Sequence, residues 1–199
     1  MSHREILESE LREFQIELSI NQKTKLARYC DELRHWNEKI NLTGLTGQDL
    51  VRRLVVEPVW IARQLMPTGG LVDIGSGNGS PAIPMHVVSG FGGCHLVEAR
   101  TKRAVFLRHV AATLRLPELK IHRARFEDVL GQMGRPDWIT LQAVSLTDEL
   151  VESIRRVCSS TTTIVWITAS GASPPLQPTR SFNIPITGTQ VLLFRLDLS

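Results

Sequence analysis

The stretch Val72-Asp73-Ile74-Gly75-Ser76-Gly77-Asn78-Gly79 decides the fold of this chain. It contains the end of a short apolar run, residues 71–74, and it precedes a helical pattern at residues 82–88. Glycines in such a turn allow positive φ angles and let a ligand approach the backbone closely. A strand, a glycine-rich turn and a helix in this order are typical of the carboxyl edge of a parallel sheet, where nucleotide-like ligands bind. The stretch therefore predicts a ligand site at such an edge.

Short apolar runs alternate with amphipathic segments after residue 70. Strands are predicted at residues 71–74, 95–98, 120–122, 138–141 and 161–168, and helices at residues 82–88, 102–114 and 146–157. Residues 182–186 and 190–196 predict a closing hairpin around Gly188, and the Pro-rich segment 170–181 predicts a loop. This alternation predicts an α/β fold with a doubly wound, mainly parallel, seven-stranded sheet.

The first 66 residues follow a helical pattern instead. Apolar residues recur at helical spacing in two groups: Leu7, Leu11, Phe14 and Leu18, then Leu26, Tyr29, Leu33 and Trp36. A third segment, residues 48–66, contains Pro58, which we expect to kink or split the helix. The sequence therefore predicts an N-terminal helical cap over residues 1–66 and a ligand-binding domain over residues 67–199.

The composition excludes several classes of protein. The 199 residues are 42% hydrophobic and 22% charged, so the chain can bury a core and is not a disordered or coiled-coil sequence. The formal net charge is only +3, but residues 98–135 hold nine basic and four acidic side chains. Such a concentration is typical of a surface that faces an anionic polymer, and a solvated helix face would give the same pattern.

Cysteines and histidines point to no metal or disulfide chemistry. Cys30, Cys94 and Cys158 show no C-x-x-C spacing, and the six histidines show no metal-ligand spacing. The N-terminus lacks an apolar signal core, and no run approaches the roughly 18 apolar residues of a membrane span. We expect a cytoplasmic monomer with neither a metal nor a membrane partner.

The residues around the turn favour one ligand. Glu98 ends the next strand, 25 residues after Asp73, where a carboxylate can accept both hydrogen bonds of a ribose diol. The dinucleotide pattern G-x-G-x-x-G fails at Ser80, which stands where its third glycine would be. Asp73 suits the cationic amino-acid part of S-adenosylmethionine better than a pyrophosphate. S-adenosylmethionine is therefore the predicted cofactor. The alternatives are a nicotinamide cofactor, with an oxidoreductase activity, and a turn that needs its glycines only for the backbone.

Two motifs resemble a known family. Residues 73–84, Asp-Ile-Gly-Ser-Gly-Asn-Gly-Ser-Pro-Ala-Ile-Pro, and the run at residues 96–108 resemble the bacterial family that methylates guanine N7 in 16S ribosomal RNA. That family is also called small-subunit methyltransferase G or glucose-inhibited division protein B. Upstream, Trp36-Asn37-Glu38-Lys39-Ile40-Asn41-Leu42-Thr43 is similar to its W-N-x-x-x-N-L-T signature. The resemblance covers about residues 22–145 and implies a Rossmann-like, S-adenosylmethionine-dependent methyltransferase domain with a helical cap.

The resemblance also implies roles for individual residues. The turn would face the methionine and ribose, Glu98 would hold the ribose hydroxyls, and Phe126 and Glu127 would lie along the adenine. The full predicted cofactor set is Asp73, Gly75, Gly77, Gly79, Ser80, Glu98, Phe126, Glu127 and Gln142. Phe126 as a core residue and Glu127 as the cap of a short helix at residues 127–130 stay open as alternatives.

The acceptor implied by the resemblance is 16S ribosomal RNA or the 30S subunit. Lys102, Arg103 and Arg108 would contact phosphates. RNA or the bound base would be contacted by Trp36, Asn37 and Asn41. For two residues of the upstream motif a purely structural role is the alternative: Trp36 would pack the cap on the sheet, and Asn41 would cap a turn. Guanine N7 carries a lone pair and no proton, so methyl transfer to it needs alignment but no general base, and no catalytic side chain is predicted.

The chain departs from the family on the acceptor side. Leu141-Gln142-Ala143 stands where the family has S-R-A, so a neutral amide replaces an arginine. The family's R-H-x-x-D-S run appears as Arg52-Arg53-Leu54-Val55-Val56-Glu57, and Ala169-Ser170-Gly171 replaces its K-G pair. These changes leave open a second function, an S-adenosylmethionine-binding relative with a changed acceptor or no turnover.

Overall fold

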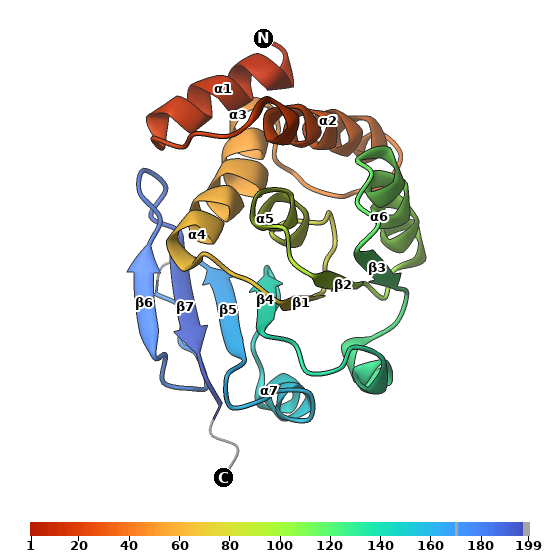
Figure 1. Cartoon of the computed structure of the whole chain (residues 1–199), viewed down its shortest axis with the longest axis vertical. Coiled ribbons are helices and arrows are strands. Elements are labelled where there is room, and N and C mark those ends of the chain that lie inside the picture. The colour runs from red at the N-terminus through yellow and green to blue at the C-terminus, as the bar shows by residue number, and fades with distance from the viewer. Residues whose placement is uncertain (170, 197–199) are drawn as a thin grey trace.

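A seven-stranded sheet lies between two layers of helices (Figure 1). The computed structural model describes residues 1–169 and 171–196. The strands are β1 (Gly70–Ile74), β2 (Gly93–Val97), β3 (Leu119–His122), β4 (Trp138–Gln142), β5 (Thr163–Thr168), β6 (Arg180–Asn183) and β7 (Gln190–Phe194). Their order is β3-β2-β1-β4-β5-β7-β6, and only β7 runs antiparallel to its two neighbours among the described pairs. The predicted α/β, mainly parallel fold is confirmed.

Helices cover each face of the sheet. They are α1 (His3–Glu13), α2 (Ile20–Asn37), α3 (Gly47–Val51), α4 (Glu57–Leu65), α5 (Ala82–Ser89), α6 (Thr101–Thr113) and α7 (Asp148–Arg155), with short 3₁₀ helices η2 (Phe126–Asp128) and η3 (Leu130–Gln132). Capping boxes define where the first two begin, because Ser2 pairs with Glu5 and Ser19 pairs with Gln22. The core residues of α4, α5 and α6 belong to one side of the sheet, and those of α7 belong to the other.

The predicted disruption at Pro58 takes the form of a π-helical segment. This segment, η1 (Arg52–Val56), joins α3 to α4 in one continuous run (Figure 1). Within it the Glu57 backbone N–H donates to the Arg52 carbonyl, five residues back. Pro58 directly follows this segment, in the first turn of α4, and its missing N–H removes one bond from the helical hydrogen-bond ladder. The helix is therefore widened before the proline instead of being broken at it.

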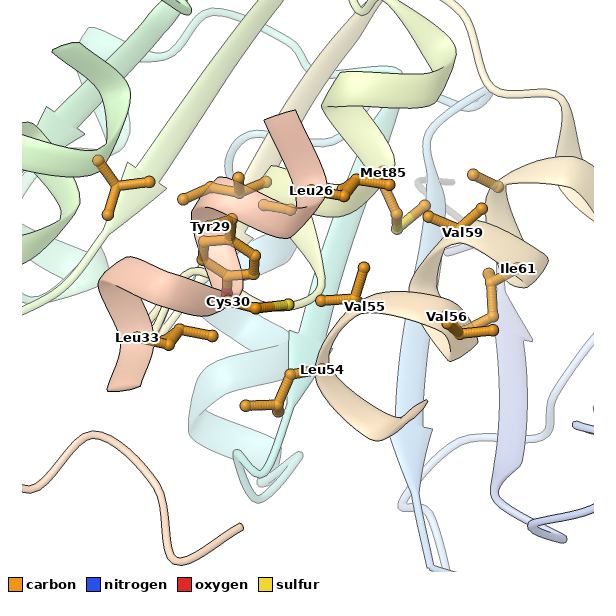
Figure 2. Packing of buried hydrophobic residues seen from close by; sticks show 14 of the residues in the cluster. Leu26, Tyr29, Cys30, Leu33, Leu54, Val55, Val56, Val59, Ile61 and Met85 are labelled. Carbon is orange, nitrogen blue, oxygen red and sulfur yellow. The ribbon is translucent and has the colours of Figure 1, made fainter. Parts of the chain in front are cut away.

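One hydrophobic core joins the N-terminal helices to the sheet. Leu26, Tyr29 and Leu33 of α2 gather with Val55 of η1 and Met85 of α5, all of them fully buried or nearly so (Figure 2). The same cluster continues to strand residues on that face of the sheet. The boundary between residues 66 and 67 stays a prediction, because the two parts share this core.

The C-terminal hairpin differs in its limits from the prediction. β6 starts at Arg180, inside the segment expected to be loop, because Arg180 and Ser181 pair with Leu193 and Leu192 of β7. It ends at Asn183, since the Ile184 N–H donates to the Thr189 carbonyl and closes the turn. Residue 170, part of the expected loop and of the Ala169-Ser170-Gly171 departure, lies outside the described residues.

The three cysteines are free thiols inside the fold. Cys30, Cys94 and Cys158 are buried. Burial raises the thiol pKa of each, to about 11 for Cys158. In the described part of the chain, no helix combines the length and the apolar character that crossing a membrane requires.

Candidate active site

The glycine-rich turn is fixed to the end of β2. The backbone N–H groups of Gly75 and Ser76 both donate to the Val97 carbonyl, at 2.9 and 3.0 Å. Gly75 and Gly77 have backbone φ angles of +71° and +50°, values that residues other than glycine rarely adopt. The turn therefore needs glycine for its conformation as well as for access.

The space beside Gly75 is also closed to a side chain. A Cβ atom built there would lie 2.7 Å from Cγ2 of Val144, which follows β4. On the cap side, the Tyr29 hydroxyl of α2 donates to the Asn78 carbonyl at 2.8 Å. The turn is thus held between the cap and the loop after β4.

Glu98 lies behind the turn and orders it. One carboxylate oxygen accepts from the Gly77 N–H at 2.9 Å, and the other accepts from the Arg100 N–H at 2.7 Å. The side chain is buried. A carboxylate offers about four lone-pair positions, so both oxygens keep acceptor capacity. Glu98 is not among the residues that form the cavity wall described below, and its contact with the ribose hydroxyls stays a prediction.

A cavity of about 630 Å³ opens at this edge of the sheet, between the sheet and the cap. Its wall is formed by the turn, the loop after β4, the end of β5 and parts of the cap: residues 75–78, 80, 142–145, 166–169, 42, 43, 45, 53, 54 and 57, with 103 and 189. Its size lies within the range typical of small-molecule sites. Arg53, Glu57 and Arg103 are the charged residues among the described ones in this wall.

Gln142 and Ser80 link the two loops of the wall. The Ser80 hydroxyl donates to the Gln142 side-chain oxygen at 3.0 Å. The amide is half-buried at the end of β4. The two residues are therefore in the predicted place, and their contact with a cofactor stays a prediction. Gly79, also in the predicted set, is not in the cavity wall, because its Cα faces Ile83 and Leu107.

The Asp73 side chain is not part of the cavity wall, and its contact with a cofactor stays a prediction. Its carboxyl group is buried and accepts from the Thr140 hydroxyl at 2.6 Å, while the other oxygen, Oδ2, has no hydrogen-bond partner among the described residues. Asp73 and Thr140 are register partners on β1 and β4, so their side chains lie on the same face of the sheet. Burial raises the pKa of Asp73 to about 7.

The two predicted adenine contacts lie in different surroundings. Phe126 is buried in the core beside Val97 and Val129, as the alternative reading had it. Glu127 is exposed and lies inside η2, whose N-cap position is held by Arg125, so its alternative role as a helix cap is wrong. Contact of Phe126 and Glu127 with adenine stays a prediction.

The upstream motif builds the cavity wall. The Asn37 side-chain oxygen accepts from the N–H groups of Leu42 and Thr43, at 2.8 and 3.0 Å, and its NH₂ group donates to the Thr43 carbonyl at 2.8 Å. Its amide therefore holds the backbone of this loop, and the predicted RNA contact by Asn37 stays a prediction. Trp36 packs edge-on against Phe106, at 5.7 Å between ring centroids. This packing joins the cap to α6, a helix that covers the sheet, and not to a strand as the alternative role had it.

The predicted basic residues of α6 separate into two groups. Lys102 and Arg108 are exposed. Arg103 instead lies in the cavity wall near Gly77 and donates to the Asn41 carbonyl at 3.1 Å. The Asn41 side chain is exposed, and Asn37 holds the turn that Asn41 was expected to cap. RNA contact by Lys102, Arg108 and Asn41 stays a prediction.

Sequence reasoning missed Arg53, Glu57 and Thr189 as members of this site. Their only signal was the departure from R-H-x-x-D-S, which marked positions 53 and 57 without giving them a role. The structure brings them into the wall from η1, α4 and the hairpin turn. Over the described residues, no cluster of His, Cys, Asp or Glu side chains is placed to hold a metal ion.

Comparison with known proteins identifies the family. The model of the family described as rRNA small subunit methyltransferase G matches residues 22–178. The chain belongs to this family. It is 37% identical over 143 residues to Ribosomal RNA small subunit methyltransferase G of Chloroflexus aggregans, covering 69% of this chain and 60% of that protein. The protein of the same name from Geobacter metallireducens is 35% identical over 132 residues, covering 65% and 60%. The chain thus spans about 60% of the length of these curated relatives.

Solved structures show the same fold. An RNA methyltransferase from Salinibacter ruber, in complex with S-adenosyl-L-homocysteine, matches with a TM-score of 0.56 at 17% identity. The match covers 76% of this chain and 92% of that one. At this identity the likeness concerns the architecture alone, and the α/β methyltransferase fold expected from the family resemblance is confirmed.

Proposed function

We propose that this chain is an S-adenosylmethionine-dependent methyltransferase that acts on guanine N7 of 16S ribosomal RNA, as a cytoplasmic monomer, on the free RNA or the 30S subunit. One observation carries the proposal. In a member of this family, the turn at Gly75–Gly77 forms part of a cavity wall at the carboxyl edge of the sheet, and the Gly77 N–H of this turn donates to the buried Glu98.

The residues at the turn fit this cofactor. The backbone of Gly75 and Gly77 forms part of the cavity wall, so a methionine or ribose group can lie against it there. Glu98 is positioned at the end of β2 with free acceptor capacity for the ribose hydroxyls. Gln142 and Ser80 offer neutral hydrogen-bonding groups beside the turn, in the same cavity wall. Together these groups match a ligand that combines a ribose with an amino acid.

The chemistry requires positioning more than proton transfer. S-adenosylmethionine supplies an electrophilic methyl group on its sulfonium when bound. The chain's own residues exclude water and hold the acceptor base. In reactions between two bound partners, alignment of this kind can remove a large part of the activation barrier. The wall between Leu54 and Ile167 supplies the apolar surface for the base. A general base is not needed, because guanine N7 loses no proton.

Methyl transfer to 30S subunits tests the proposal. Subunits isolated from cells that lack this methylation are incubated with the protein and cofactor labelled in its methyl group. We expect label in 16S ribosomal RNA, and N7-methylguanosine in a mass-spectrometric analysis of its nucleosides. The Gly75→Ala variant should transfer no label. Label in a different nucleoside, or none with correctly folded and cofactor-bound protein, would contradict the proposal.

A second candidate function is an S-adenosylmethionine-binding protein with a changed acceptor or no turnover. The neutral Gln142 in place of the family's arginine favours it, because a charge-assisted bond is roughly twice as strong as a neutral one. Calorimetric binding of the cofactor without transfer to 30S subunits would favour this second function.

A further inference from the structure

Glu57 is a buried carboxyl group in the wall of the cavity. It begins α4, is 1% exposed, and accepts a hydrogen bond from the Thr189 hydroxyl at 3.1 Å. Among the described residues that form the wall, it is the single carboxylate. No ion pair within 4 Å is made by Glu57 in the described part of the chain. A group of this kind is costly to bury unless a donor approaches it.

Glu57 lies at the end of the cavity away from the glycine-rich turn. Its partner Thr189 directly precedes β7, whose first residue Gln190 pairs with Thr168 at the end of β5. Three strand spacings separate β7 from β1, or about 14 Å, since neighbouring strands lie about 4.8 Å apart. The cofactor predicted at Gly75 and the carboxylate of Glu57 therefore face different parts of one cavity.

The pKa of Glu57 is raised above its ordinary value, because the effect of burial exceeds that of its polar neighbours. Burial raises its pKa, while the hydroxyls of Thr187 and Thr189 and the nearby Arg53 and Arg52 lower it. Because the ionised form only accepts hydrogen bonds, a ligand that presents two adjacent N–H donors would stabilise it.

We infer that Glu57 is a specificity-determining residue that binds the N1–H and N2–H donors of the target guanine. The inference rests on the proposed function and names how that site selects its base. These donors lie on the Watson–Crick edge, on the opposite side of the purine from N7, so a carboxylate there leaves N7 directed to the cofactor end. Adenine presents an acceptor at N1, and uracil and cytosine each present one N–H position, so only guanine offers the matched pair.

Replacement of the target nucleotide by inosine tests the inference without any change to the protein. The methylated guanosine is first mapped by mass spectrometry, and 30S subunits are then reconstituted with 16S ribosomal RNA that carries inosine at that position. Inosine keeps N7 and N1–H but lacks the N2 amino group. We expect kcat/KM to fall about 10- to 100-fold, the range for one hydrogen bond to a charged group. Equal rates on guanosine and inosine would overturn the inference.

The Glu57→Gln variant then tests whether the Glu57 side chain causes the preference for guanosine over inosine. We expect the guanosine-to-inosine ratio of kcat/KM to fall below about 3, because the amide can no longer accept from both donors, while cofactor affinity is unchanged. Glu32→Gln is the matched control, a buried carboxyl group of α2 that lies outside the cavity wall, and it should keep the full ratio. A Glu57→Gln protein that keeps the parent's ratio would overturn the inference alone. A parent that transfers no methyl to guanosine would overturn the proposed function and this inference together.

Discussion

Asp73 is held in an environment that disfavours its charge. Its carboxyl group has one donor, Thr140, and a second oxygen without a partner among the described residues. Burial raises the pKa to about 7. The folded protein therefore keeps this proton up to about pH 7, whereas the unfolded chain releases it near its ordinary value of 3.8. The free energy of unfolding should consequently fall as the pH rises from about 4 to 7.

Asp73→Asn removes this titration and keeps the size of the side chain. We expect the free energy of unfolding of the parent, relative to the variant, to fall by about 2–4 kcal/mol between pH 4 and pH 7.5. Denaturant titrations of both proteins at a series of pH values measure it. All other groups titrate in both proteins, so parallel curves would show that Asp73 has an ordinary pKa.

Single residues also show where sequence reasoning ends. The upstream motif marked Asn37 as a candidate site residue, but the pattern does not reveal that its amide holds the backbone at Leu42 and Thr43. Arg103 and Lys102 are neighbours of equal charge in the sequence, and only the fold directs one into the cavity wall. Glu57 was missed because its partner Thr189 lies 132 residues away.

Strands and helices were predicted well where apolar residues recur in a regular pattern along the sequence. The alternation of apolar runs gave the parallel strands to within one or two residues, since a buried strand needs a continuous apolar stretch. The π-helical segment Arg52–Val56 could not be predicted, because its apolar residues continue the pattern of an ordinary helix. The limits of β6 also depend on pairing with β7, which no local pattern in residues 180–183 reveals.

The glycine-rich turn is the element on which the cofactor prediction depends. Gly75 and Gly90 have similar φ angles, +71° and +65°, but a Cβ atom would clash with Val144 at Gly75 and meet nothing within 4 Å at Gly90. Alanine substitutions at the two positions therefore distinguish the effect of backbone strain, which both share, from the effect of a steric clash, which only position 75 has.

Alanine at each position tests the turn. Both Gly75→Ala and Gly90→Ala should lower the free energy of unfolding by roughly 1 kcal/mol or more, because alanine disfavours positive φ. Only Gly75→Ala should abolish S-adenosylmethionine binding, as measured by isothermal calorimetry. Equal affinity of the two variants for S-adenosylmethionine would show that the cofactor does not bind at the turn.

At the scale of the whole molecule, the cavity belongs to neither the cap nor the sheet alone. α2 reaches the turn through the Tyr29 hydroxyl, and η1 and α4 bring Arg53 and Glu57 to the same space. The shared core keeps these elements in register with the strands (Figure 2). The sequence predicted both parts separately, but the contacts between them depend on packing that no motif records.

The exposed basic residues of α6 should make RNA binding depend on salt. Replacing Lys102 and Arg108 by Gln removes two phosphate contacts, so the slope of log K against log salt concentration should become shallower by about 2. Filter binding of 16S ribosomal RNA across a salt titration measures the slope. Arg4→Gln with Arg12→Gln on α1 makes the same change of charge on a different helix and should leave it unchanged. Identical slopes in the two double variants would show that α6 is only a solvated face.

The burial of all three cysteines makes the protein suitable for site-specific labelling. Thiol reagents attack the thiolate, and Cys30, Cys94 and Cys158 are shielded and have raised pKa values. A cysteine introduced at Ser145, which is exposed at the rim of the cavity, would then be the single reactive thiol of the native protein. A fluorophore attached there would report optically when the cavity fills, without removal of any natural cysteine.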